Sequence, residues 1–135
     1  MTSKVIFYYS LTGKTEAVIN KNELENIDVI KINKLKEDQV DLESYDTIVF
    51  GTPTYGRGVP PEYFLTIINK LHSLKGKRIG LFGSGNTIYG DDFCGALDVL
   101  EQIFQDKNEI LFKYKFEGYP RETDIKKVNE LILEA

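Results

Sequence analysis

The sequence predicts an α/β fold in which helices cover both faces of a doubly wound, five-stranded parallel sheet. Five short runs rich in β-branched and aromatic residues alternate along the chain with segments whose apolar residues recur at helical spacing. The first three runs are almost continuously apolar, which is typical of strands that are covered on both faces. Because crossover connections between parallel strands are right-handed, we expect the helices to lie on both faces of the sheet.

The five predicted strands are bounded by polar or glycine-bearing segments. They occupy residues 4–9, 28–32, 47–51, 78–83 and 109–116. In the last strand apolar residues alternate with Lys113 and Lys115, so we expect one buried face and one solvated face. Because lysine discourages pairing with a further strand, we place this strand at the rim of the sheet.

Helical periodicity marks the segments between the later strands. Residues 64–71 carry an apolar stripe at i, i+3, i+4 and i+7, and two prolines open this predicted helix. Stripes of the same kind lie within residues 93–104 and 125–132. Thr123 is the expected N-cap of the last helix, because its hydroxyl can accept a hydrogen bond from a free N–H group of the first turn.

Length and composition favour a single domain that spans residues 1–135. Hydrophobic residues make up 41% of the chain, yet no apolar run approaches the roughly 20 residues needed to cross a membrane. The first residues lack the pattern of a signal peptide, so we expect a cytoplasmic protein that does not associate with a membrane. A net charge of −4 disfavours nucleic acid as a partner, and one cysteine with one histidine gives little basis for a metal centre.

The loop after the first predicted strand, S-L-T-G-K-T at residues 10–15, has the composition of a phosphate site. Its hydroxyls and the N–H groups of a helix that begins near Thr15 or Glu16 favour an anion. A triphosphate loop requires glycine five places before Gly13, and Tyr8 in that place excludes the triphosphate motif. A strand-to-helix turn capped by its own hydroxyls is the alternative interpretation.

Two further loops are expected at the same end of the sheet. In doubly wound sheets, ligands bind beyond the carboxyl ends of the strands. The loop at residues 52–60 and the loop at residues 83–90 each place a tyrosine, Tyr55 and Tyr89, beside glycine. Two aromatic rings together with a phosphate-binding turn are suited to a flat aromatic cofactor with one phosphate tail.

Two of these segments resemble the flavodoxin superfamily. Residues 10–15 look like its [ST]-x-T-G-x-T phosphate loop, and F-C-G-A-x-D-x-x-E at residues 93–101 is similar to the helix after its second flavin loop. The resemblance implies a flavodoxin-like fold with strand order 2-1-3-4-5 and FMN bound without a covalent link.

Within this superfamily the sequence resembles more closely the NrdI flavoproteins that serve class Ib ribonucleotide reductases. Three segments carry this resemblance: T-P-T-Y-G-R-G-V-P at residues 52–60, G-S-G-N-T-I-Y-G-D-D-F-C at 83–94 and F-K-Y-K-F-E-G at 112–118. The resemblance implies that reduced FMN reacts with O₂ and supplies superoxide or a related oxidant to the dimanganese subunit of the reductase. A flavin reductase or a ferredoxin-type protein would supply the electrons.

Two other functions remain open on the sequence. The first is that of a general flavodoxin, which carries electrons between redox enzymes. The second is that of a binding or regulatory module that has kept the fold and lost FMN, because a fold does not fix a function.

By position, the resemblance implies which residues bind FMN. Phosphate contacts are expected from the 10–15 loop, Tyr55 and Tyr89 are expected to border the ring, and backbone groups near Cys94 are expected at its polar edge. The full predicted site is Ser10, Leu11, Thr12, Gly13, Lys14, Thr15, Pro53, Thr54, Tyr55, Gly56, Ser84, Gly85, Asn86, Tyr89, Gly90, Phe93 and Cys94.

Two side chains of this set have competing interpretations. Lys14 either attracts the phosphate or points into solvent, and we favour solvent. Cys94 lies at the start of a predicted helix, where it is either a packing residue or a reactive thiolate, and we favour packing. We expect no catalytic side chain and no metal ligand.

Overall fold

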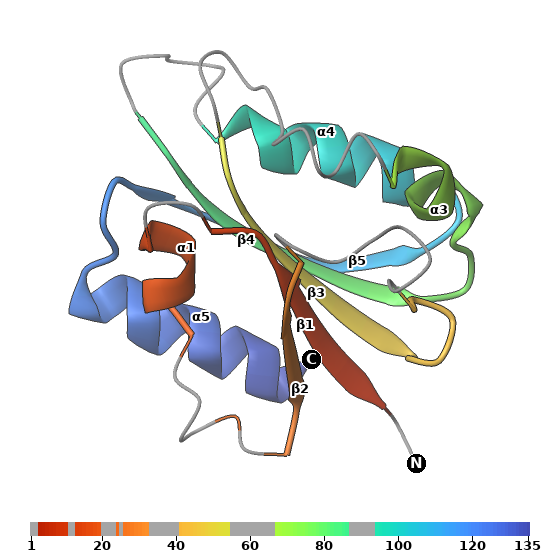
Figure 1. Cartoon of the computed structure of the whole chain (residues 1–135), viewed down its shortest axis with the longest axis horizontal. Helices are drawn as coiled ribbons and strands as arrows, with labels where there is room; N and C mark the ends of the chain where they lie inside the picture. The colour runs from red at the N-terminus through yellow and green to blue at the C-terminus, as the bar shows by residue number, and fades with distance from the viewer. Residues whose placement is uncertain are drawn as a thin grey trace.

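The structure of the chain, a computed structural model, describes residues 3–10, 13–19, 24, 26–32, 41–54, 67–86 and 94–135. Five parallel strands form one sheet in the order β2-β1-β3-β4-β5, and Figure 1 shows them flanked by helices. The predicted fold class and strand order are therefore confirmed.

The strands begin where the sequence predicts and differ from it at their ends. They are β1 (Lys4–Tyr8), β2 (Asp28–Lys31), β3 (Thr47–Pro53), β4 (Arg78–Gly85) and β5 (Glu109–Glu117). Both β3 and β4 run two residues farther than predicted, because pairing continues through Thr52 with Gly83 and Pro53 with Ser84. Proline and glycine usually mark the end of a strand, but here they sit in the last ladder positions.

Four helices are present in the described segments: α1 (Lys14–Ala17), α3 (Ile68–Ser73), α4 (Gly95–Phe104) and α5 (Glu122–Glu134). Figure 1 shows α3 and α4 on one face of the sheet and α1 and α5 on the other. The predicted helix that ends near residue 71 is described only from residue 67, and Phe93 at the start of the next stripe also lies outside the described residues.

Two apolar clusters, one on each face of the sheet, hold the layers together. Alternate residues of β1 serve opposite faces, since Phe7 packs in the cluster under α3 and α4, whereas Ile6 packs in the cluster against α5. On the first face the rings of Phe50 and Phe104 stack with centroids 5.1 Å apart. The continuous apolar character of the central strands therefore follows from burial on both faces.

The last helix begins earlier than the sequence predicts. Arg121 is the N-cap of α5, and Thr123 lies inside the first turn, so the prediction of Thr123 as the N-cap was wrong. The Asp124 carboxylate accepts a hydrogen bond from the Arg121 N–H at 2.9 Å, and it also accepts one from the Tyr114 hydroxyl at 2.8 Å. A contact between β5 and α5 thus fixes the start of the helix.

The rim position of β5 is confirmed, but its second face is not solvated as predicted. Helix α4 covers that face, and Lys113 Nζ lies 2.7 Å from Asp98 Oδ1 and 2.9 Å from Glu101 Oε1. Lys115 Nζ lies 3.0 Å from the other oxygen of Asp98. Burial alone would raise the pKa of Asp98, but the hydrogen bonds and charges of the two lysines outweigh it and lower that pKa.

Candidate cofactor site at the carboxyl edge of the sheet

A cavity of about 290 Å³ opens beyond the carboxyl ends of the strands. It is lined by the segments that follow β1, β3, β4 and β5, which is where a doubly wound sheet binds ligands. Its described lining consists of Lys14, Pro53, Thr54, Ser84, Gly85, Asn86, Glu117 and Gly118.

Six of the predicted site residues line this cavity, and four others lie in the segments beside it. The six are Lys14, Pro53, Thr54, Ser84, Gly85 and Asn86. The four are Ser10, Gly13, Thr15 and Cys94, which the structure describes but which are not part of the lining. Leu11, Thr12, Tyr55, Gly56, Tyr89, Gly90 and Phe93 lie outside the described residues.

Glu117 and Gly118 line the cavity but were not predicted as site residues. Glu117 is the last residue of β5 and Gly118 follows it, and the pairing of β5 with β4 runs to Gly85 with one register shift near Ile79. The strand order is the signal that could have found them. Because β5 lies beside β4 and the two strands are parallel, the residues at the carboxyl end of β5 lie at the same edge of the sheet as the cavity. Glu117 adds a carboxylate to a site for which the sequence predicted neutral groups and one lysine.

The turn between β1 and α1 holds one buried hydroxyl that has no hydrogen-bond partner among the described residues. Gly13 adopts a left-handed conformation, with φ of 88°, and its carbonyl accepts the first helical hydrogen bond, from Ala17, at 2.9 Å. The Glu16 N–H group donates to Ser10 Oγ at 3.4 Å. Thr15 is 1% exposed, and its Oγ1 has no hydrogen-bond partner among the described residues. A buried hydroxyl without a partner is costly, so this atom fits a ligand that accepts or donates a hydrogen bond here.

Backbone hydrogen bonds fix the three strand ends that form the floor of the cavity. The Thr54 N–H group donates to the Ser84 carbonyl, and the Gly118 N–H group donates to the Gly85 carbonyl, each at 3.0 Å. The Thr54 hydroxyl in turn accepts a hydrogen bond from the Ala96 N–H at 3.2 Å, which ties β3 to the start of α4. The floor is therefore preorganised by the sheet and by one helix.

Cys94 is a packing residue in this structure. It is fully buried, and its thiol lies 3.6 Å from the carbonyl oxygens of both Gly83 and Phe116, to either of which it can donate. Burial raises the pKa of the thiol to about 12, so sulfur stays protonated at neutral pH. The geometry supports the packing interpretation over the reactive thiolate.

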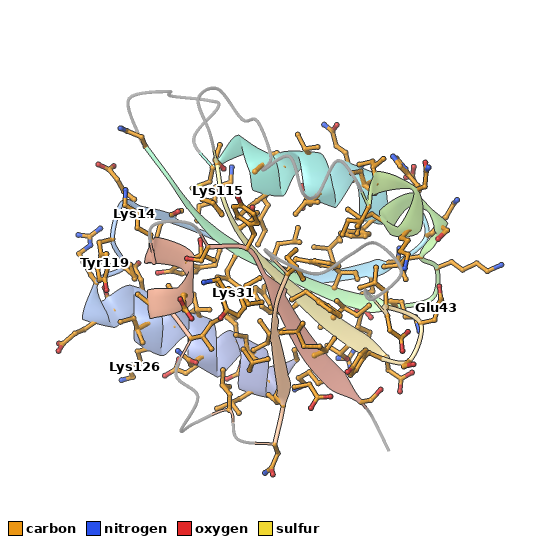
Figure 2. The ribbon with its side chains drawn as sticks, viewed as in Figure 1. Lys14, Lys31, Glu43, Lys115, Tyr119 and Lys126 are labelled. Atoms are coloured by element: carbon orange, nitrogen blue, oxygen red, sulfur yellow. The ribbon has the colours of Figure 1, made fainter. Side chains whose placement is uncertain are left out.

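One cation and one anion are present in the described lining of the cavity. Lys14, the first residue of α1, is exposed and also lines the cavity, and Figure 2 labels it there. Its orientation toward a phosphate or toward solvent stays a prediction. Glu117, also exposed, contributes the negative charge from the end of β5. The positive charge of Lys14 would attract a negatively charged part of a ligand, and the carboxylate of Glu117 would repel it.

Neither a metal centre nor a membrane span is found in the described segments. No group of three or more His, Cys, Asp and Glu side chains there is arranged to hold a metal ion. Among the same residues, no helix is both long enough and apolar enough to cross a membrane.

Comparison with known proteins identifies the family. The family model named Flavodoxin matches residues 6–119. The chain is 30% identical over 130 residues to "Probable flavodoxin 2" of Bacillus subtilis, covering 89% of this chain and 85% of that protein. It is 31% identical over 136 residues to a flavodoxin of Maridesulfovibrio salexigens, covering 93% and 92%.

Solved structures agree with this match. Oxidised flavodoxin 1 of Bacillus cereus superposes with a TM-score of 0.82 at 25% identity, covering 98% of each chain. A Fusobacterium nucleatum flavodoxin solved with FMN bound shares the fold, with a TM-score of 0.73 at 23% identity over 99% and 96% of the two chains. These relatives are named flavodoxins and not NrdI proteins, so the comparisons support the broader resemblance. The chain therefore belongs to the flavodoxin family, and FMN, the predicted cofactor, is the cofactor of that family.

Proposed function

We propose that this protein carries electrons between redox enzymes by means of FMN held without a covalent link at the carboxyl edge of its sheet. The observation that carries the proposal is the cavity of about 290 Å³ at that edge, in a chain that belongs to the flavodoxin family. Ligand sites range from about 300 to 1,000 Å³, so the described part of the cavity is near the lower end of that range.

The turn after β1 is the proposed phosphate-binding end of the site. The Thr15 hydroxyl, which has no partner in the described part of the chain, the Ser10 hydroxyl and the N–H groups that begin α1 supply donors to an anion. Lys14 adds a positive charge from the cavity wall. A phosphate monoester offers several acceptor oxygens to these donors, and hydrogen bonds to a charged acceptor are stronger than those to a neutral one.

The ends of β3 and β4 are the proposed binding surface for the ring. Gly85 and Asn86 line the cavity, and their backbone groups are proposed to meet the polar edge of a flat heterocycle. The positions of Tyr55 and Tyr89 at the ring remain predictions from the sequence. FMN, when bound, supplies the one-electron redox chemistry, while the residues of the chain bind it, orient it and exclude water.

The charges around the cavity would influence how readily the bound cofactor accepts an electron. Lys14 stabilises added negative charge, and Glu117 opposes it. Because both side chains are exposed, water and salt screen their effects, so each is expected to adjust the potentials modestly.

The first experiment tests whether the protein binds FMN. A purified chain that is yellow, releases FMN on denaturation and takes up added FMN after removal of flavin supports the proposal. A colourless chain that fails to bind added FMN would favour the module that has lost its cofactor. Electron carriage is then measured by supplying a flavin reductase or a ferredoxin-type reductant and following the reduction of cytochrome c, which should depend on this protein.

The second candidate function is activation of a class Ib ribonucleotide reductase, and the observation in its favour is the resemblance of residues 52–60 and 83–94 to NrdI proteins. Stopped-flow oxidation of the reduced protein by O₂ separates the two functions. We expect slow oxidation and no trapped superoxide from an electron carrier. Tyrosyl radical formed from the reduced protein, O₂ and a manganese-loaded class Ib subunit would instead favour the second function.

The cytoplasmic location stays a prediction from the sequence.

A further inference from the structure

Three side chains form a connected group beside the proposed phosphate-binding turn. The Tyr8 hydroxyl donates to Glu16 Oε1 at 2.9 Å, and Lys31 Nζ lies 3.7 Å from Glu16 Oε2. Tyr8 and Lys31 are the last residues of β1 and β2 and are register partners, so their side chains leave the same face of the sheet. The Glu16 carboxylate is therefore held between the ends of two strands; Figure 2 labels Lys31 there.

The backbone N–H group of Glu16 bonds within the turn, whereas its carboxylate contacts the ends of β1 and β2. The Glu16 N–H group donates a hydrogen bond to Ser10 Oγ at 3.4 Å. Glu16 also directly follows Thr15, whose buried hydroxyl has no partner among the described residues. A carboxylate so close to this turn would repel a phosphate if it were free to swing toward it. In the structure, Tyr8 binds one carboxylate oxygen and Lys31 faces the other.

We propose that Tyr8 and Lys31 are positioning residues that hold the Glu16 carboxylate away from the turn and thereby set the preference of the site for phosphorylated over unphosphorylated flavin. This inference rests on the proposed FMN-binding function. It assigns specificity to three residues that do not line the cavity and that the sequence did not single out as site residues.

The hydroxyl of Tyr8 is the main anchor of the group. Tyr8 is 3% exposed, and burial followed by the hydrogen bond to Glu16 raises its pKa to about 12, so the hydroxyl remains a donor at neutral pH. The Lys31 and Glu16 side chains are 44% and 42% exposed, so their attraction is screened by water. Removing the Tyr8 hydroxyl should therefore release the carboxylate.

The test compares the affinities of flavin-free protein for FMN and for riboflavin, which lacks the phosphate, by quenching of flavin fluorescence. For Tyr8→Phe we expect an affinity about tenfold lower for FMN and a riboflavin affinity within about twofold of the wild type. Unchanged riboflavin binding also shows that the fold and the ring site are intact.

A second pair of variants tests whether the charge of Glu16 causes the loss. Glu16→Gln keeps an oxygen that can accept the Tyr8 hydrogen bond and removes the charge, so its FMN affinity should equal or exceed that of the wild type. In the double variant Tyr8→Phe with Glu16→Gln, FMN affinity should return to within about twofold of the wild type, because no carboxylate remains to be released.

The chain offers a matched control at the opposite edge of the sheet. The Tyr45 hydroxyl donates to Asp28 Oδ2 at 2.9 Å, a pair of the same chemistry at the start of β2. Tyr45→Phe should leave the ratio of FMN to riboflavin affinity unchanged.

Four results would overturn the inference. These are an unchanged FMN affinity in Tyr8→Phe, an equal loss for both flavins in that variant, a double variant as weak as Tyr8→Phe, and a lower ratio of FMN to riboflavin affinity in Glu16→Gln. The last variant alters a half-exposed side chain and tests the role of its charge even if Tyr8→Phe does not fold. A wild-type chain that binds neither flavin would contradict the proposed function instead.

Discussion

A β carbon built on Gly85 would lie 2.7 Å from the backbone nitrogen of Cys94 and 2.8 Å from its sulfur. The end of β4 and the residue that precedes α4 are thus in contact through a position that has no room for a side chain. Cys94 itself has φ of 51°, and it is the one residue other than glycine with positive φ among the described segments. The floor of the cavity depends on this close approach.

Gly85→Ala should lower the free energy of unfolding by about 1–3 kcal/mol, because the added methyl group collides with backbone that cannot turn away. FMN binding should also weaken, since the start of α4 must shift away from the cavity floor. Chemical denaturation and FMN titration measure the two effects.

Gly76→Ala is the control for this prediction. Gly76 has φ of 71° with open space around it, so alanine there should cost about 1–2 kcal/mol through backbone strain alone. Because Gly76 lies before β4, at the other end of the strand, FMN affinity should not change. Equal losses of FMN affinity in the two variants would contradict the role given to Gly85.

The Cys94 thiol should resist alkylation in the folded protein. Its pKa rises from 9.0 to about 12 through burial, which lowers the thiolate fraction at neutral pH by about 1,000-fold before access is considered. Mass spectrometry after exposure to iodoacetamide at pH 8 should show almost no modification, and urea should make the thiol fully reactive. Rapid labelling of folded protein would show that the sulfur is not enclosed as described.

Asp98→Asn should destabilise the chain by about 1 kcal/mol at neutral pH, because Lys113 and Lys115 lose their shared acceptor. The pKa of Asp98 is lowered in the fold, so its contribution is present above the unfolded value, near 3.8, and is lost as pH falls through the folded value. The gap in unfolding free energy between wild type and variant should therefore shrink below about pH 4.

The control for Asp98 is an exposed ion pair on the same sheet. Arg78 Nε lies 3.9 Å from Glu109 Oε2, and the two side chains are 44% and 69% exposed. Glu109→Gln should change the unfolding free energy by less than about 0.5 kcal/mol. A gap for Asp98→Asn that stays constant from pH 7 to pH 3 would contradict the ionic origin of its effect.

The two opposite charges of the cavity lining should have opposite effects on FMN affinity. Lys14→Gln should weaken FMN binding about threefold to tenfold, and Glu117→Gln should strengthen it, with both differences shrinking at high salt. Isothermal titration at low and high ionic strength gives these values. Lys75→Gln, an exposed change before β4, should have no effect, and a loss in Lys75→Gln equal to that in Lys14→Gln would show that only net charge matters.

The central strands could be located from the sequence because burial on both faces leaves a direct signal. Residues such as Ile6 and Phe7 must both be apolar when they face opposite clusters, so the central strands stand out as continuous apolar runs. The absence of glycine at position 8 was equally direct, since it excluded a triphosphate loop from one residue.

The predictions that were wrong or missing depend on contacts between distant segments. A strand in which apolar and polar residues alternate has the same sequence pattern whether its polar face meets water or the acidic residues of a helix. For Lys113, only the structure shows that the neighbour is an acidic residue of α4. Asp124 caps the first turn of α5 by accepting a hydrogen bond from the Arg121 N–H, a local contact, and the distant Tyr114 hydroxyl holds the same carboxylate in place. Glu117 enters the site because β5 lies beside β4, and that order came from the resemblance and not from the local pattern.

The lining of the cavity extends from Lys14 to Glu117 and Gly118, so its walls come from nearly the whole length of the chain. Such a site exists only after the strands on both sides of β3 have joined the sheet. Any ligand that binds there therefore stabilises the complete fold and not a local segment, by an amount that grows with the logarithm of its concentration. FMN affinity is therefore a measure of how completely the distant walls of the site are assembled, because a segment that leaves the sheet takes part of the lining with it.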